Sequence, residues 1–447
     1  ISCEFINCEL SNKNRAIIRM ENADSSLNVD NCTFRNDNPI TAKVIDTKCI
    51  NLVVNNCRFI KTSKVARRIP QGDKLPGKTL NFVLTNCIFD SSTGDANYDG
   101  ICYHLEFSRP ATVIFENNII TNLKYDDKKS NSILIDTDNK IDQLVLRNLS
   151  FIDNSCSAYT GGGSGIVLRE VKYVIFVDCK FINNKAVQYY HYEPSYVNLD
   201  RKSGDGGGIH LGLLCKTVEG AIKFDNCIFK DNKANKHGGA IAIQTLNTVE
   251  IVNCIFDSNK ANYDFSSNKL LFENHFNKKS DGRGGAIYIN PTFHYNFIDY
   301  QISCYNLSAF MTSVSIKNST FYSNSAYDGY GIYVEGDDGG TKFEIEGNNF
   351  TNNYKSNPND ENDINISTRG IIASEVHTIP NGVIEKNHFT YDLERAKPHK
   401  LVFVDHYGNI IPTFYFTESH AFSYSKDFSH SADFSHSTSF SNSADFT

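Results

Sequence analysis

The residues best placed to do chemistry are an acid, a histidine and an arginine on or beside glycine-rich segments: Asp205, His210 and Arg283. A polysaccharide lyase needs an aspartate that binds Ca²⁺ and a basic residue close to it. The alternative interpretation is that Asp205 occupies a turn and that the other residues are polar, outward-facing positions of strands. We adopt this second interpretation.

A hydrolase would need a general acid and a base that flank one glycosidic bond. The groups available are Asp337-Asp338, His237-Gly238 and Arg395-Ala-Lys397, and the first two lie about a hundred residues apart in the chain. The third follows the last of the repeats described below. The sequence contains neither a nucleophile elbow nor a phosphate-binding loop. We therefore expect no catalysis, no cofactor and no metal.

The elements that would position these residues are short strands, because the chain is built from an internal repeat. The repeat is apolar-x-apolar-x-Asn-Cys-x-Phe, as in Leu27–Phe34, Leu52–Phe59 and Phe82–Phe89. About twelve copies follow one another, most of them 24 to 31 residues apart. Their last residues are at positions 10, 34, 59, 89, 120, 151, 181, 229, 256, 321, 350 and 389.

Each copy contains a break in its alternation. The first two apolar residues alternate with period two, and so do Cys and Phe, but the two phases differ by one residue. A strand can change its inward face only at a kink. The Asn lies at that kink, and Asn tolerates left-handed dihedrals better than other non-glycine residues. Each copy therefore predicts a strand, a corner and a second strand.

A third strand follows several copies and begins with glycine, as in Gly206–Leu211, Gly238–Ile243 and Gly284–Ile289. Looser versions occur at Gly100–Leu105, Gly163–Leu168 and Gly329–Val334. Three short strands per repeat without helical periodicity are typical of one coil of a parallel β-solenoid. Coils would stack about 4.8 Å apart, so that twelve of them form a rod about 60 Å long.

The combination of Gly-Gly-Ala-Ile with Phe-x-x-Asn resembles the repeats of the polymorphic outer membrane proteins (Pmp), the chlamydial adhesins and their relatives on parasitic protists. Gly-Gly-Ala-Ile occurs at Gly238–Ile241 and Gly284–Ile287, and Phe-x-x-Asn recurs between Phe151–Asn154 and Phe350–Asn353. The resemblance implies a right-handed parallel β-helix, exposure at the cell surface and an adhesive role.

The chain has 13 cysteines, an odd number, so at least one thiol is free or pairs with another chain. We interpret the cysteines two residues before a repeat's last residue as buried thiols in a ladder. A spacing of about 4.8 Å also permits a disulfide, for example Cys32 to Cys57 or Cys227 to Cys254. The ladder positions are Cys8, Cys32, Cys57, Cys87, Cys179, Cys227 and Cys254.

Insertions are expected near 60–80, 185–205, 258–312 and 353–370, and two of them carry aromatic clusters. Such clusters suit sugar stacking or protein contact, although they would also serve to cover the flank of the rod. The clusters consist of Tyr189, Tyr190, Tyr192 and Tyr196, and of Phe293, Tyr295, Phe297 and Tyr300. Sequons that could accept an N-linked glycan include Asn306, Asn365, Asn318 and Asn148.

We divide the chain into a β-helix, residues 1–411, and an extended tail, residues 412–447, with a Phe-Ser-x-Ser-x-Asp hexapeptide repeat. In an extended tail every Phe lies on one face. Such a strand must lie on its own rod, continue as a narrower coil or add to a neighbouring copy. The repeated residues are Phe416, Phe422, Phe428, Phe434, Phe440 and Phe446.

The net charge of −7 and the pI near 6.0 argue against nucleic acid as a partner. The chain starts at Ile1 without Met, as a processed product or a segment of a longer polypeptide would. We predict a non-catalytic extracellular or cell-surface protein, adhesive or structural. Its partners would be other copies of itself, joined end to end or through the tail, or a protein or glycan of a host cell or matrix. The alternative is a pectate-lyase-like β-helix that degrades or binds polysaccharide.

Overall fold

The computed structural model describes the chain in the ranges 3–6, 16–20, 25–35, 43–47, 49–68, 80–90, 103–106, 111–125, 133–156, 162–186, 205–211, 220–243, 248–261, 282–289, 312–326, 329–334, 341–355, 382–385, 388–391 and 420–423. The ordered elements within these ranges are all strands. The described residues thus contain no helix that is long and apolar enough to cross a membrane.

Sheet A has 13 strands, and all neighbours except the last pair are parallel. Its order is β1 (Cys3–Ile6), β4 (Cys32–Arg35), β7 (Arg58–Ile60), β10 (Ile88–Asp90), β13 (Ile119–Thr121), β16 (Ser150–Ile152), β19 (Lys180–Ile182), β23 (Ile228–Lys230), β27 (Ile255–Asp257), β30 (Thr320–Tyr322), β34 (Asn349–Thr351), β37 (His388–Tyr391) and β38 (His420–Ser423).

Sheet B has 15 parallel strands. One path runs through β2 (Ala16–Met20), β5 (Lys43–Thr47), β8 (Ser63–Arg68), β11 (Tyr103–Glu106), β15 (Ile133–Arg147), β18 (Ile166–Val177), β22 (Ala221–Asp225), β26 (Thr248–Val252), β29 (Thr312–Lys317), β33 (Thr341–Glu346) and β36 (Gly382–Glu385). A branch through β3 (Ser26–Asp30), β6 (Asn51–Asn55), β9 (Leu80–Thr85) and β12 (Ala111–Glu116) joins it at β15.

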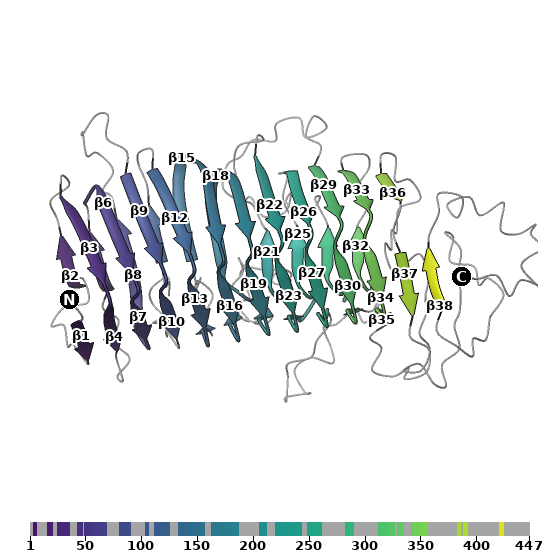
Figure 1. The fold of residues 1–447 in the computed structure, drawn as a ribbon, viewed down its shortest axis with the longest axis horizontal. Helices are drawn as coiled ribbons and strands as arrows, with labels where there is room; N and C mark the ends of the chain where they lie inside the picture. The colour runs from purple at the N-terminus through teal and green to yellow at the C-terminus, as the bar shows by residue number, and fades with distance from the viewer. Residues whose placement is uncertain are drawn as a thin grey trace, which may run out of the picture.

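Short sheets complete the coils. Sheet C contains β14 (Lys124–Tyr125), β17 (Ser155–Cys156), β20 (Lys185–Ala186) and β24 (Lys233–Ala234), and β31 (Ser325–Ala326) pairs with β35 (Tyr354–Lys355). Sheet D contains β21 (Ile209–Leu211), β25 (Ile241–Ile243), β28 (Ile287–Ile289) and β32 (Ile332–Val334). The coils stack along one axis into a rod, from β1 at one end to β37 at the other (Figure 1). The molecule is a parallel β-helix, as the repeats predict.

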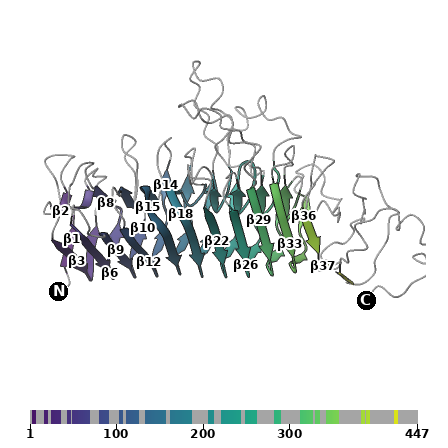
Figure 2. The ribbon, with the colours of Figure 1, turned by 90° about the horizontal axis from the view of Figure 1, so that it is seen from above.

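The predicted repeat register is confirmed along the rod. The last residues of the repeats pair with one another, for example Phe181 with Phe229 and Phe229 with Phe256. The stacked phenylalanine rings have centroids 4.5 to 5.1 Å apart and lie in one continuous core. Seen from above, the strands of sheet B run side by side along the rod (Figure 2).

The predicted corner is confirmed as well, because Asn31, Asn56 and Asn226 have φ of 51°, 53° and 54°. A second left-handed corner, not predicted, lies two residues after the repeat's last residue in several coils, as at Asn183 and Asp231. The short strands of sheet C follow this second corner. The coil therefore has more elements than the three strands expected.

Two predictions were wrong in detail. The first coil uses Cys3 and Phe5, which pair with Cys32 and Phe34, in place of the Cys8 and Leu10 chosen from the sequence. The segments 60–80 and 258–312 are not all insertion. Residues 63–68 form β8, which pairs with β5 and β11, and residues 287–289 form β28, which pairs with β25 and β32.

The tail contributes β38, which pairs antiparallel with β37 so that Phe422 lies opposite Phe389. Of the three arrangements considered, this corresponds to a tail that lies on its own rod. The tail residues Phe416, Phe428, Phe434, Phe440 and Phe446 lie outside the described residues.

Candidate functional site

A polar corner precedes the strands of sheet D, and it brings together residues that are far apart in the chain. Asp205, His237 and Arg283 each come directly before a glycine with positive φ: Gly206, Gly238 and Gly284. Because β21, β25 and β28 pair in register, the three side chains belong to successive coils. We call these three residues the corner ladder.

The corner ladder is held by hydrogen bonds from backbone to side chain. The N–H of His237 donates to Oδ1 of Asp205 at 3.1 Å. The N–H of Arg283 donates to Nδ1 of His237 at 3.2 Å. The side chains of Asp205 and His237 thus each accept the backbone N–H of the next coil's corner, which is a structural use of these two groups.

The hydrogen bond to Nδ1 places the proton of the neutral His237 ring on Nε2. Burial lowers the pKa of His237 well below 6.5, and the neighbouring positive charges of Lys236 and Arg283 lower it further. His237 therefore stays neutral at physiological pH, with its Nδ1 lone pair directed at a backbone donor. A general base needs that lone pair for its substrate.

Aromatic rings lie against the corner ladder. The ring of His237 stacks on that of Tyr288 with centroids 4.5 Å apart, and the guanidinium carbon of Arg283 lies 4.9 Å from the centroid of Tyr333. Tyr288 and Tyr333 also stack on each other at 5.9 Å. Both tyrosines alternate with the inward-facing isoleucines of sheet D, yet they are buried, with 2% and 0% of their surface exposed.

The structure separates the residues proposed from sequence for a lyase. Asp205 and Arg283 belong to the corner ladder, whereas His210 lies on β21 in the row that continues through Ala242 and Tyr288. His237, assigned from sequence to a possible hydrolase, takes the place expected for His210. Spacing alone did not reveal this, because 32 residues separate Asp205 from His237 and 46 separate His237 from Arg283.

The structure does not place the other groups considered from the sequence. Residues 337–338 and 395–397 lie outside the described residues. Among the described residues there is no group of three or more His, Cys, Asp or Glu side chains that could hold a metal ion.

The two aromatic segments also lie outside the described residues, but the strands that adjoin them are placed. Residues 187–204 lie between β20 and Asp205, and residues 290–311 follow β28. Because β21 and β28 are separated only by β25, both segments join the rod at sheet D. A third long segment, 262–281, ends just before Gly282 in the same corner.

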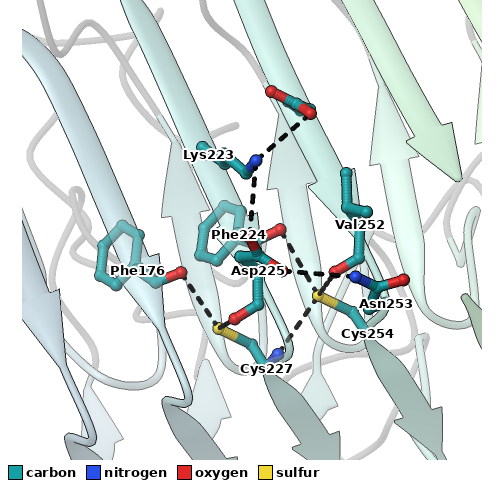
Figure 3. Close-up of polar contacts among 9 residues, drawn as sticks. Phe176, Lys223, Phe224, Asp225, Cys227, Val252, Asn253 and Cys254 are labelled. Carbon is teal, nitrogen blue, oxygen red and sulfur yellow. Dashed lines mark hydrogen bonds and ion pairs between the residues drawn. The ribbon is translucent and has the colours of Figure 1, made fainter.

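The described cysteines at the repeat positions form a structural ladder. Figure 3 shows Cys227 and Cys254 on neighbouring coils, where Sγ of Cys254 accepts the N–H of Cys227 at 3.4 Å. Their thiols donate to the carbonyl oxygens of Phe176 and Phe224, on the preceding coils. Cys32, Cys57, Cys227 and Cys254 are buried free thiols, as interpreted from the sequence, and the two disulfides that their spacing permits are not formed. Burial raises the pKa of Cys254 well above 9.0.

Two of the four sequon asparagines are described. Asn148 and Asn318 are exposed left-handed corners with φ of 49° and 50°. Nδ2 of Asn148 donates to Oδ1 of Asn117 on the adjacent coil at 2.8 Å. Glycosylation at these positions stays a prediction, and Asn306 and Asn365 lie outside the described residues.

Comparison with known families agrees with the fold. Residues 81–277 match the family model described as "Right handed beta helix region". No curated protein and no solved structure matches the chain. With the long parallel sheets, the match makes the molecule a right-handed parallel β-helix.

Proposed function

We propose that this chain is a non-catalytic, extracellular or cell-surface rod that adheres to a protein or glycan of a host cell or matrix through the segments inserted at sheet D. The observation that carries the proposal is that three long segments adjoin sheet D in the chain: 187–204 precedes β21, 262–281 precedes β28 and 290–311 follows β28. Rigid scaffolds commonly place their binding residues on such segments. Two of the three contain the clustered aromatic residues, which suit contact with sugars or proteins.

The chemistry of the corner ladder supports the absence of catalysis. Oδ1 of Asp205 and Nδ1 of His237 accept backbone N–H groups, and Arg283 packs on Tyr333. Asp205 and Arg283 are also 4% and 8% exposed. These contacts are those of groups that hold coils together.

The binding test replaces residues 187–204 or 290–311 by a short Gly-Ser linker and measures adhesion to host cells, matrix proteins and a glycan array. The matched control replaces residues 69–79, which adjoin β8 on sheet B. We expect at least a tenfold loss of binding for the first two variants and none for the control. Equal binding by all three variants would contradict the proposal.

The same glycan panel tests the alternative of a polysaccharide-degrading enzyme. The proposal predicts no new reducing ends and no unsaturated products. Product release that disappears in Asp205→Asn would identify an enzyme instead.

A structural role as a fibre subunit is the second candidate, favoured because β38 ends sheet A as an edge strand, to which a strand of another copy could add. Deletion of residues 412–447 separates the two roles. It should abolish polymers that depend on the tail and leave binding through the sheet D segments intact.

A further inference from the structure

The outward face of sheet B changes from apolar to polar and charged along the rod. Five strands that neighbour one another in sheet B are β6, β9, β12, β15 and β18. At one outward-facing position of each, the residue is β-branched and apolar, and these residues pair in register. We call this set the apolar row: Val53, Val83, Ile114, Val145 and Ile175. From β22 onward the same position is polar or charged: Lys223, Glu250, Ser315 and Glu344.

The positions on either side of the apolar row are almost without charge. One flank consists of Asn51, Asn81, Thr112, Gln143 and Tyr173, and the other of Asn55, Thr85, Glu116, Arg147 and Val177. The two charged residues are of opposite sign, and Glu116 Oε1 lies 3.8 Å from Arg147 Nε. The surface therefore carries no net charge.

The apolar row is at least partly exposed to solvent, unlike the outward row of sheet D. Ile114 is 40% exposed, and the other four residues of the row are half-buried. On the flank, Tyr173 is 42% exposed, whereas Tyr288 and Tyr333 on sheet D are buried. Isolated apolar residues on a surface are common, but a contiguous row of β-branched side chains across five strands marks an interaction site.

We propose that this face of sheet B binds the same face of a second copy of the chain, with the two rods antiparallel. A surface without net charge does not select a charged partner such as a polyanion. Its rows repeat at the strand spacing, about 4.8 Å, and sheets pack face to face through such rows. The same face of a second copy has both this spacing and this neutrality.

The charged residues on the other half of sheet B favour the antiparallel orientation of the two rods. Parallel rods related by a twofold axis would place each coil opposite itself, so that Lys223 would face Lys223 and Glu250 would face Glu250. Antiparallel rods centred on Ile114 place Val53 opposite Ile175 of the second copy. They also leave Glu250, Ser315 and Glu344 beyond the end of the partner's apolar row. Like charges are then kept apart.

The size of the face sets the expected affinity. Five strands about 4.8 Å apart and five residues of about 3.3 Å each give about 400 Å² per copy. The pair would bury about 800 Å², less than a standard stable interface of about 1,600 Å². The dimer is therefore weak, with a dissociation constant on the order of 10 to 1,000 µM.

The test measures self-association of the full chain by sedimentation equilibrium from about 5 to 500 µM. Ile114→Lys should raise the dissociation constant at least about tenfold, because it places two like charges opposite each other. Ser315→Lys is the matched control, since it adds the same charge to the same row outside the contact. It should change the constant by less than about twofold. Circular dichroism verifies that each variant is folded.

A mixing experiment tests the orientation. Val53→Lys and Ile175→Glu should each dimerise poorly alone and associate when mixed, since the new charges face each other only in antiparallel rods. Association restored instead by mixing Val53→Lys with Val53→Glu would overturn the antiparallel arrangement. A wild-type chain that stays monomeric throughout, or that Ile114→Lys leaves unaffected, would overturn the proposal and leave this face to a different partner.

Discussion

Replacing the asparagine of a Phe-x-x-Asn motif should lower stability strongly and locally. Asn232 is the best example. Asn232 is completely buried, and its Nδ2 donates to the carbonyl oxygen of Phe181 at 2.8 Å and to Oδ1 of Asn259 at 2.9 Å. Its Oδ1 accepts the backbone N–H of Asn184 at 3.0 Å. One side chain therefore links three coils.

Asn232→Ala removes these bonds and leaves the buried N–H of Asn184 without this acceptor and the carbonyl of Phe181 without this donor. A buried polar group that loses its partner costs about 1–3 kcal/mol. The two groups together give an expected loss of about 2–6 kcal/mol. Asn349→Ala is the matched control, because Asn349 is exposed on sheet A, and the expected loss there is below about 0.5 kcal/mol.

The assay is hydrogen exchange followed by mass spectrometry on peptides that cover residues 180–186. In a solenoid each coil contacts only its neighbours, so the loss is concentrated near the changed coil. At about 1.4 kcal/mol per factor of ten, a loss of 2 kcal/mol accelerates exchange about 30-fold. Exchange in Asn232→Ala no faster than in Asn349→Ala would refute the role assigned to the motif.

Four further predictions concern the corners and the ladders. Asn226→Ala should lower the free energy of unfolding by about 1–2 kcal/mol, and Asn226→Gly by less, because φ is 54° at this position; denaturant titration measures both. Gly239→Ala should prevent or strongly destabilise folding, since its Cβ would lie 2.1 Å from the carbonyl oxygen of Gly285; the melting temperature reports this. The folded state depresses the pKa of His237 below 6.5, so stability is complete above pH 6.5 and falls by up to about 1.4 kcal/mol per unit below it; His237→Phe should flatten this part of the pH profile. Cys254 should resist alkylation at pH 8 in the folded protein and react after denaturation, as quantified by mass spectrometry.

Much of the fold was predictable because each coil of a solenoid repeats the same sequence pattern and the same local structure. The phase break in each repeat predicted the left-handed corner, and the spacing of the copies predicted which residues stack. The first coil was misplaced because Cys8-x-Leu10 and Cys3-x-Phe5 have the same spacing, and only the pairing with Cys32 and Phe34 distinguishes them. The short strands of sheet C were missed because two residues, such as Lys233–Ala234, carry no periodic signal.

The candidate site was predictable only in part. Asp205 and Arg283 were noticed for their residue types, but their companion is His237 and not His210. Which residues meet across coils depends on the length of the chain between them, and insertions change that length from one coil to the next. A useful signal was present in the position directly before each corner glycine, where Asp205, His237 and Arg283 all occur.

The stacking of the coils in register is tested most directly by methyl NMR of a chain labelled only at isoleucine. Ile209, Ile241, Ile287 and Ile332 are buried and pair in this order along sheet D. We expect nuclear Overhauser contacts between Ile209 and Ile241, between Ile241 and Ile287 and between Ile287 and Ile332. A direct contact that skips a coil, such as Ile209 with Ile287, or the absence of contacts between these neighbours would contradict the β-helix.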